Sequence, residues 1–383
     1  MRVIVRGGRV LTPFLDLGEK DIAIESGVIR DVGSNLTGDK TVDASGLTVA
    51  PGFVDTHFHG YGGVDFTLAS SGDALRVAQE VTRHGVTGFL ASLVAAPHEV
   101  LLKASSELAV AIERQEPGSG ARILGIHLEG PYLNPQMRGA MDPRFFREPS
   151  TAELSEYYRA SRGHIKQVTV APELPGSTEF IRRAVEMGIT VGLGHTDATY
   201  EDAVRAVLAG ASKANHIFNQ MRHFHHREPG VAFALLEQPN VFIEMIADLI
   251  HLHPATTRLV ARVAGPGRTV LITDAVAATG LPDGEYTLGG LKIVVRGGVS
   301  RLAETGALAG STLTMDRAVA NIVKLGFSLA DAVRMASTTP ALSIGLGGKL
   351  GVIAPGYLAD LVLLDEKLRV VKTIVGGVEV YGE

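Results

Sequence analysis

The sequence predicts an α/β protein, a (β/α)8 barrel with a small β-sandwich domain formed by both chain termini. Two observations support this prediction. Through the middle of the chain, apolar segments rich in Val, Ile and Leu alternate with amphipathic segments, the pattern of buried parallel strands joined by crossover helices. Both ends carry short alternating strands separated by turn residues. With 383 residues, the chain suits one large α/β domain or two to three smaller ones, with a sizeable core.

Eight apolar segments are expected to form the barrel strands. They are residues 50–57, 86–93, 123–129, 168–172, 190–195, 214–218, 241–247 and 269–274. The helices between them are expected to end at glycines such as Gly85, Gly188 and Gly265, where a left-handed cap needs no Cβ. Eight strand–helix units favour a barrel over the competing doubly wound sheet. A glycine-rich segment, 280–306, is expected to form a hairpin or lid.

The two ends of the chain are expected to form one small domain together. Neither end alone could bury both faces of a sheet. We therefore assign residues 1–50 and 347–383 to the small domain and residues 51–346 to the barrel.

The composition excludes several classes of protein. The chain is 45% apolar with a net charge of −5, which indicates a globular protein. It has no basic run and no Trp, so no nucleic-acid partner is expected. No apolar run approaches the roughly 20 residues that span a bilayer, so no membrane insertion is expected. The absence of cysteine removes thiolate chemistry and favours the reducing cytoplasm.

Polar side chains interrupt the apolar segments where predicted strands end. The first strand ends in a His-x-His, and alternation points His57 and His59 to the same side. Glu129 ends the third strand, His195 closes the fifth and His216 lies within the sixth. In a barrel these strand ends open on one face, where active sites of this fold are built. The sequence therefore predicts a cluster of imidazoles and a carboxylate at one rim.

Such a cluster suits a divalent metal ion. Glu129, His195 and His216 would leave an open position for water, as catalytic zinc requires. Nitrogen and oxygen ligands suit Zn²⁺ but also allow Fe, Mn or Co. Asp274, which ends the eighth strand, is the candidate general base for a water whose pKa the metal lowers to about 7. Each position also has an alternative interpretation. His57 and His59 would be surface histidines at a strand end, and Glu129 would form a structural ion pair. His195 and His216 would be hydrogen-bonded core histidines, and Asp274 a helix cap.

These residues resemble the amidohydrolase superfamily, and most closely its N-acetylglucosamine-6-phosphate deacetylase family. The resemblance covers nearly the whole chain. It rests on Pro51-Gly52-Phe53-Val54-Asp55, His127-Leu128-Glu129-Gly130-Pro131, Gly194-His195-Thr196, residues 216–219, Arg227-Glu228-Pro229-Gly230, Thr273-Asp274-Ala275, Leu308-Ala309-Gly310-Ser311 and the tail 351–360.

The resemblance implies hydrolysis of the acetamide of N-acetylglucosamine 6-phosphate to glucosamine 6-phosphate and acetate. Glu129, His195 and His216 match the family's principal metal ligands, and Asp274 its catalytic acid/base. Some members carry a His-x-His on the first strand and bind a second ion, so His57 and His59 allow one ion or two. The positions that match the family's substrate contacts are Ala140, Met141, Asn219, Gln220, Arg227, His251, Leu308, Ala309 and Gly310. In the family the arginine comes from the neighbouring subunit, which implies a homodimer.

Two departures from the family pattern leave questions open. Met141 stands where the family usually has a histidine, and a thioether cannot donate a hydrogen bond. Either a second ion at the first-strand histidines polarises the carbonyl instead, or the substrate differs. The loop with His223, His225 and His226 is richer in histidine than the family loop, and its histidines are extra phosphate donors, adventitious metal ligands or solvated side chains.

Two other functions compete with this interpretation. One is a deacetylase of another N-acetylated sugar or sugar phosphate, such as N-acetylgalactosamine 6-phosphate. The other is a non-catalytic barrel scaffold, since fold alone does not imply chemistry.

Overall fold

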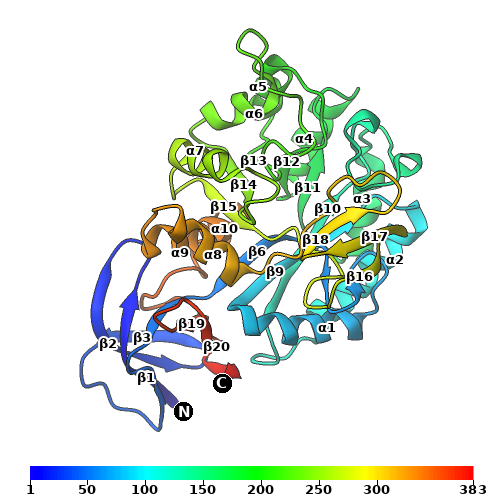
Figure 1. Ribbon diagram of the computed structural model, residues 1–383. Coiled ribbons are helices and arrows are strands. Elements are labelled where there is room, and N and C mark those ends of the chain that lie inside the picture. Colours follow the sequence, from blue (N-terminus) through cyan, green and yellow to red (C-terminus); the bar gives the residue numbers. More distant parts are fainter. Residues whose placement is uncertain (383) are drawn as a thin grey trace.

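The computed structural model describes residues 1–382, and in this range an eight-stranded parallel barrel sheet dominates the fold (Figure 1). The barrel strands follow one another in chain order as β6 (Phe53–Phe58), β9 (Val86–Val94), β10 (Arg122–Glu129), β11 (Ile165–Val170), β12 (Thr190–Leu193), β13 (Lys213–Ala214), β14 (Phe242–Ile246) and β15 (Thr269–Ile272). Each overlaps or adjoins one of the eight expected segments, so the barrel prediction is confirmed. The expected first strand is divided at Gly52, where a Cβ would lie 2.2 Å from the Thr87 side chain.

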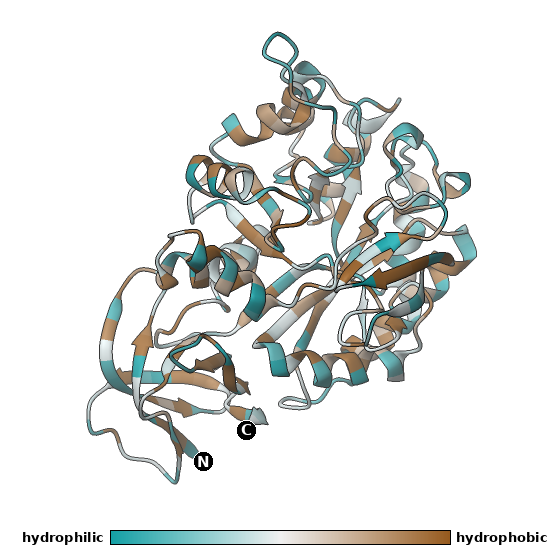
Figure 2. Cartoon of the chain, in the orientation of Figure 1, coloured by the Kyte–Doolittle hydropathy of each residue, from teal (hydrophilic) through white to brown (hydrophobic). Residues whose placement is uncertain are grey.

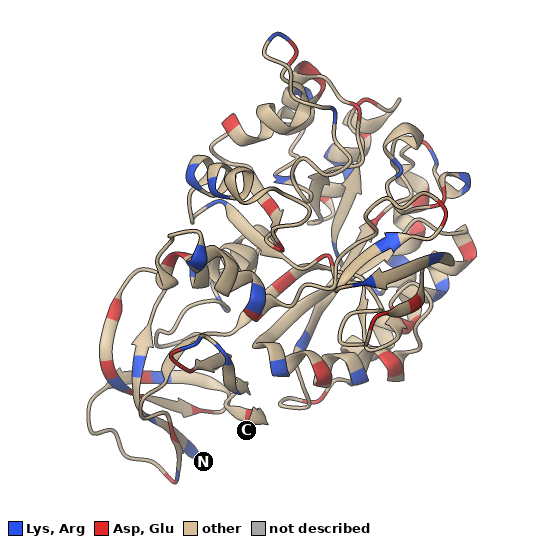
Figure 3. Cartoon of the chain, in the orientation of Figure 1, with Lys and Arg blue, Asp and Glu red and all other residues tan. Residues whose placement is uncertain are grey.

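Helices cover the outside of the barrel. They are α1 (Ser71–Glu80), α2 (His98–Arg114), α3 (Thr151–Ala160), α4 (Ser177–Glu186), α5 (Tyr200–Leu208), α6 (Gly230–Glu237), α7 (Pro254–Ala264), α8 (Met315–Lys324), α9 (Leu329–Ala336) and α10 (Thr338–Ser343), with 3-10 turns at Val81–His84, Pro135–Met137 and Pro143–Phe145. Figure 2 shows apolar residues concentrated on the barrel strands, and Figure 3 shows both signs of charge interspersed along α1 and α2. None of the helices within residues 1–382 is long and apolar enough to cross a bilayer.

The barrel closes between its first and last strands. A parallel bridge joins Phe58 to Ala275. The Asp274 amide donates to the His57 carbonyl at 2.9 Å, and the His59 amide donates to the Ala275 carbonyl at 2.9 Å. The closure itself therefore sets the His-x-His segment beside Asp274.

Both chain ends build the second sheet, and the two termini lie close together in Figure 1. Its strands run in the order β21 (Val378–Gly382), β20 (Val370–Val375), β19 (Leu361–Leu364), β5 (Thr48–Pro51), β1 (Arg2–Leu11), β2 (Asp16–Glu25) and β3 (Val28–Gly33), and β4 (Lys40–Asp43) pairs with β1. It encloses its own apolar cluster, which includes Ile22, Val49 and Leu363. The pairing of both ends is as expected; the final residue assigned to this domain, Glu383, lies outside the described residues.

A separate three-stranded antiparallel sheet packs beside the carboxyl end of β9. It comprises β16 (Gly284–Leu288), β17 (Leu291–Arg296) and β18 (Val299–Leu302), within the segment expected to form a hairpin or lid. Leu288 packs in one apolar cluster with Val94 and Met141. A short hairpin of β7 (Gly60–Tyr61) and β8 (Val64–Asp65) follows the His-x-His strand.

Candidate active site

A cavity of about 210 Å³ lies at the carboxyl end of the barrel strands. It is lined by His59, Val94, Glu129, Gly139, Ala140, Met141, His195, His216, Asn219, Gln220, His251, Asp274, Leu288, Leu308 and Gly310. Residues far apart in sequence therefore meet at one rim, as the barrel prediction requires.

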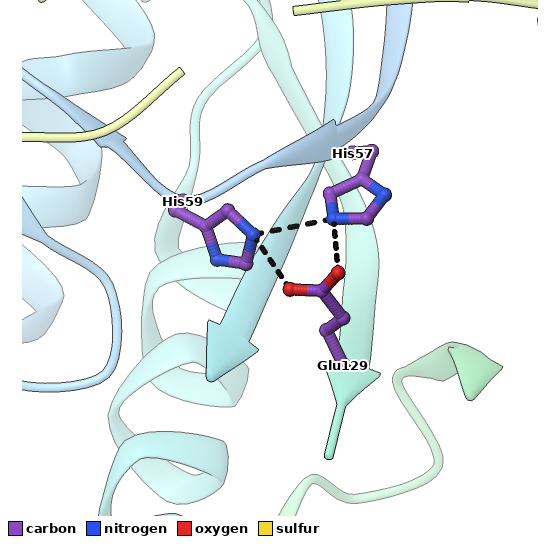
Figure 4. A group of neighbouring side chains, drawn as sticks. All are labelled: His57, His59 and Glu129. Atoms are coloured by element: carbon purple, nitrogen blue, oxygen red, sulfur yellow. Dashed lines mark hydrogen bonds and ion pairs between the residues drawn. The ribbon is translucent and has the colours of Figure 1, made fainter. Parts of the chain in front are cut away.

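Glu129 is the common member of two clusters of ligand atoms. Its Oε1 lies 2.8 Å from Nε2 of His216 and 3.3 Å from Nε2 of His195. The same Oε1 also lies 3.1 Å from Nε2 of His57, and the second oxygen, Oε2, lies 3.0 Å from Nε2 of His59 (Figure 4). All five side chains are buried. Each cluster brings one ligand atom per residue within 4.8 Å of the others.

The hydrogen bonds behind the imidazoles show that this donor set fits a cation. Nδ1 of His57 faces a carboxylate oxygen of Glu244 at 3.0 Å, and Nδ1 of His195 faces the carbonyl of Met137 at 2.7 Å. Nδ1 therefore carries a hydrogen, and Nε2 is the nitrogen that faces Glu129 and offers a lone pair once a cation displaces its proton. Such nitrogens and carboxylate oxygens that converge on one point suit a positive centre. The nitrogen and oxygen donors suit zinc.

The protonation states of the imidazoles and of Glu129 depend on one another. Burial lowers the pKa of His59, but Glu129 and Asp274 raise it to about 9. Burial alone would raise the pKa of Glu129, but His57 and His59 hold it well below its ordinary value. Glu129 is therefore ionised at neutral pH, and any cation that binds here displaces protons from the imidazoles.

Asp274 lies at the cavity wall with Oδ1 3.3 Å from Nε2 of His59. Burial would raise the pKa of this carboxyl, but the hydrogen bond from His59 and the charge of His57 lower it. Asp274 is therefore ionised at neutral pH, as a general base must be.

The backbone is strained at several of these positions. His195, His216 and Asp274 have φ of 49°, 24° and 51°, in the left-handed region that non-glycine residues rarely adopt. Such conformations cost about 1–3 kcal/mol each and persist only where the surroundings enforce them. The barrel thus holds these side chains in place at a cost in stability.

Seven of the nine expected substrate contacts line the cavity: Ala140, Met141, Asn219, Gln220, His251, Leu308 and Gly310. Ala309 is instead fully buried in the apolar cluster under the three-stranded sheet. Arg227 is exposed and is not among the residues that line this cavity; its Nη1 lies 2.7 Å from Nε2 of His226. The neighbouring His223 and His225 are exposed too.

His251 has the electrostatics of an anion ligand. Its Nδ1 lies 2.7 Å from Oδ2 of Asp248. Burial lowers the pKa of His251, but Asp248 outweighs that effect and raises it. The ring is thereby stabilised in its charged form, which donates hydrogen bonds to phosphate strongly.

Sequence reasoning missed the polar groups beneath the rim. Glu244 contacts His57, and the Ser92 carbonyl lies 3.2 Å from Nδ1 of His59. Glu244 interrupts the apolar segment 241–247 just as Glu129 interrupts the third segment, so the same signal was available. Nothing in the sequence predicts the contact of the Ser92 carbonyl, because every residue has a backbone carbonyl and residue type does not show which one makes a contact.

The fold and the rim together define a class, the barrel hydrolases that hold metal through strand-end histidines and carboxylates. A family model described as the amidohydrolase family matches residues 48–380. The chain therefore belongs to the amidohydrolase family.

Individual relatives match along almost the entire chain. The N-acetylgalactosamine-6-phosphate deacetylase of Escherichia coli is 40% identical over 372 residues, covering 97% of each chain. The N-acetylglucosamine-6-phosphate deacetylase of Vibrio furnissii is 40% identical, covering 92% of this chain and 88% of that one. Among solved structures, an aspartate-to-alanine mutant of the Mycobacterium smegmatis N-acetyl-D-glucosamine-6-phosphate deacetylase, in complex with N-acetyl-D-glucosamine-6-phosphate, is 39% identical with a TM-score of 0.92, covering 99% of each chain.

Proposed function

We propose that this protein hydrolyses the N-acetyl group of N-acetylglucosamine 6-phosphate, releasing glucosamine 6-phosphate and acetate. The observation that carries the proposal is the convergence of Glu129, His195, His216 and the ionised Asp274 on one cavity. The similarity to deacetylases along nearly the whole chain supports the same substrate class.

Glu129, His195 and His216 would hold one divalent ion, and His57 and His59 would share Glu129 with a second. When bound, the metal lowers the pKa of water to about 7 and polarises the acetyl carbonyl. We assign zinc because the donors are imidazole and carboxylate groups, with Fe, Mn or Co as the alternatives.

Asp274 carries the proton through the reaction. Its ionised carboxylate takes a proton from the attacking water as the water oxygen bonds to the acetyl carbon. The protonated carboxyl then donates that proton to the amide nitrogen as the carbon–nitrogen bond breaks. The proton gained in the first step is given up in the second, so Asp274 is regenerated.

The substrate's phosphate is assigned to His251, Asn219 and Arg227. His251 is favoured as a cation by Asp248, and Asn219 lines the cavity with it. Arg227 is exposed and outside the set of residues that line the cavity of its own chain. We therefore propose a homodimer in which Arg227 reaches the neighbouring cavity. Phe224 and Phe233, 54% and 44% exposed with ring centroids 5.7 Å apart, put apolar surface beside it for a partner to cover.

A charged sugar phosphate does not cross a bilayer unaided. Together with the absence of cysteine, which favours a reducing compartment, this leads us to place the activity in the cytoplasm.

Acetate release from four substrates tests the proposal: N-acetylglucosamine and N-acetylgalactosamine, each with and without a 6-phosphate. We expect the highest kcat/KM with N-acetylglucosamine 6-phosphate, and at least tenfold less without the phosphate because each charged hydrogen bond is worth about 1.5–3 kcal/mol. The galactosamine epimer is the second candidate substrate, favoured by the Escherichia coli relative and by the missing donor at Met141. Release from neither phosphorylated sugar would reject the proposal.

A further inference from the structure

Glu244 is a buried carboxylate that the proposed chemistry does not use. It lies within β14, below the rim, and its side chain is fully buried. Its Oε2 lies 3.0 Å from Nδ1 of His57, and its Oε1 lies 2.9 Å from Nζ of Lys213. A carboxylate taken out of water needs such partners. Each oxygen here has further donors too: Oε1 accepts from Gln167 at 3.1 Å, and Oε2 accepts from Asn215 at 3.2 Å.

Lys213 is equally buried and is held on three sides. Besides Glu244, its Nζ donates to Oγ1 of Thr56 at 2.9 Å and to Oε1 of Gln167 at 2.7 Å. An ammonium has three hydrogens, so this one is satisfied. Lys213 thus balances the charge of Glu244 at one oxygen, and Nδ1 of His57 donates to the other.

The contact fixes which nitrogen His57 presents to the rim. With Nδ1 donating to Glu244, Nε2 is the nitrogen that faces Oε1 of Glu129, 3.1 Å away, and Nε2 of His59, 3.2 Å away (Figure 4). Carboxylates behind a ligating histidine fix its tautomer and ring orientation and raise its basicity.

The other rim histidines in the described chain have no such support. Nδ1 of His59 and of His195 face backbone carbonyls, and the buried Nδ1 of His216 has no hydrogen-bond partner among the described residues. The carboxylate therefore supports His57, which belongs to the cluster with His59 and not to the cluster with His195 and His216.

We propose that Glu244, paired with Lys213, is a positioning residue for a second metal ion. It holds His57 in the orientation in which Nε2 is the ligand, and so controls occupancy of the metal position at His57 and His59. Occupancy of the other position, at Glu129, His195 and His216, does not depend on it. This inference rests on the proposed metal-dependent function. The Glu244–Lys213 pair touches neither substrate nor the reacting atoms in this scheme.

Metal content, measured by mass spectrometry after equilibration at a series of fixed free Zn²⁺ concentrations, tests the inference. We expect two ions per chain in the unaltered protein. In Glu244→Gln we expect one ion to remain and affinity for the second to fall by about 10–100-fold. Cobalt-substituted protein gives an independent signature, because magnetic coupling between two adjacent Co²⁺ ions should disappear in the variant.

Asp360→Asn is the matched control. It also converts a buried carboxylate to an amide and breaks an ion pair, that of Asp360 Oδ2 with Nε of Arg122 at 3.0 Å, at the other end of the barrel. We expect it to lower the melting temperature and leave two ions bound. If Glu244→Gln does not fold, the double variant Glu244→Gln with Lys213→Met, which leaves no unbalanced charge, takes its place with the same expected loss.

Two results would overturn the inference. One is unchanged affinity for the second ion in the Glu244 variant alongside a lowered melting temperature, which would make the pair purely structural. The other is a single ion in the unaltered protein at saturating Zn²⁺. If the unaltered protein releases acetate, neither result contradicts the proposed function. If the unaltered protein has no deacetylase activity but Glu244→Gln loses the second ion, the proposed function is rejected and this inference stands.

Discussion

The rim of the barrel and the loop 222–228 differ in how completely contacts within one chain fix the positions of their side chains. At the rim, Glu129 and the histidines are buried, and strained backbone holds His195, His216 and Asp274 in place. In the loop, residues 223–228 are exposed, and Arg227 contacts its own neighbour His226. The comparison teaches that one chain brings together the side chains at the rim, whereas the proposed contact of Arg227 with a substrate phosphate would depend on what packs against the loop.

Metal removal should have the largest effect, because it acts on the rim. We expect chelation to abolish acetate release and leave the apolar core folded. Burial lowers the pKa of His59 but Glu129 and Asp274 raise it to about 9, so at pH 7 the ion-free ring carries a proton that a cation must displace. Zn²⁺ binding should therefore release protons, and its affinity should rise with pH up to about 9.

Titration calorimetry in two buffers of different ionisation enthalpy measures this release, and circular dichroism checks the fold. Binding without proton release at pH 7 would contradict the assigned rim electrostatics.

Loss of the base is the next largest expected effect. In Asp274→Asn we expect kcat to fall by about 10²–10⁴-fold, because proton transfer to and from the substrate is lost, with metal content and substrate affinity retained. Asp365→Asn is the control, since Asp365 pairs with Arg369 at 2.6 Å and neither residue lines the cavity. Undiminished turnover in Asp274→Asn would remove this residue from the mechanism.

The loop should respond differently from the rim. In Arg227→Ala we expect KM for the phosphorylated sugar to rise by about 10–100-fold with a smaller change in kcat, because a charged hydrogen bond is lost far from the reacting carbonyl. His223→Ala, in the same exposed loop, should change KM less than twofold.

Co-expression of Arg227→Ala with Asp274→Asn sharpens this comparison. In mixed dimers one cavity would combine an intact Asp274 with an intact Arg227 from the neighbour, so activity at low substrate should exceed the sum of the two parents. Activity equal to that sum would place Arg227 outside the neighbouring site.

The smallest expected effect lies at the apolar wall. Met141→His returns a hydrogen-bond donor to the cavity, and one such bond is worth about 0.5–1.5 kcal/mol. We therefore expect the ratio of kcat/KM between the glucosamine and galactosamine epimers to change by less than about tenfold. A larger change would make Met141 the main determinant of sugar specificity.

The barrel and the meeting of these side chains at its rim could be predicted because residue type shows where polar groups end the apolar strands. His57, Glu129 and His195 each interrupt an apolar segment, and burying such groups needs a shared partner. The pairing of both ends into one sheet followed from the same burial argument.

Other features depend on contacts that residue type does not encode. The Ser92 and Met137 carbonyls that orient His59 and His195 are backbone atoms. The burial of Ala309 against the three-stranded sheet, and not at the cavity wall, depends on how that sheet packs. Glu244 was open to prediction, but its pairing with Lys213 joins two strands, β14 and β13, whose register the sequence leaves open.

Anomalous X-ray diffraction at the zinc edge, from crystals grown with Zn²⁺, tests the central claim most directly. We predict a peak about 2.0–2.2 Å from Nε2 of His195, Nε2 of His216 and a carboxylate oxygen of Glu129. A rim without a peak, with zinc held instead by the histidines of the loop 222–228, would contradict the account.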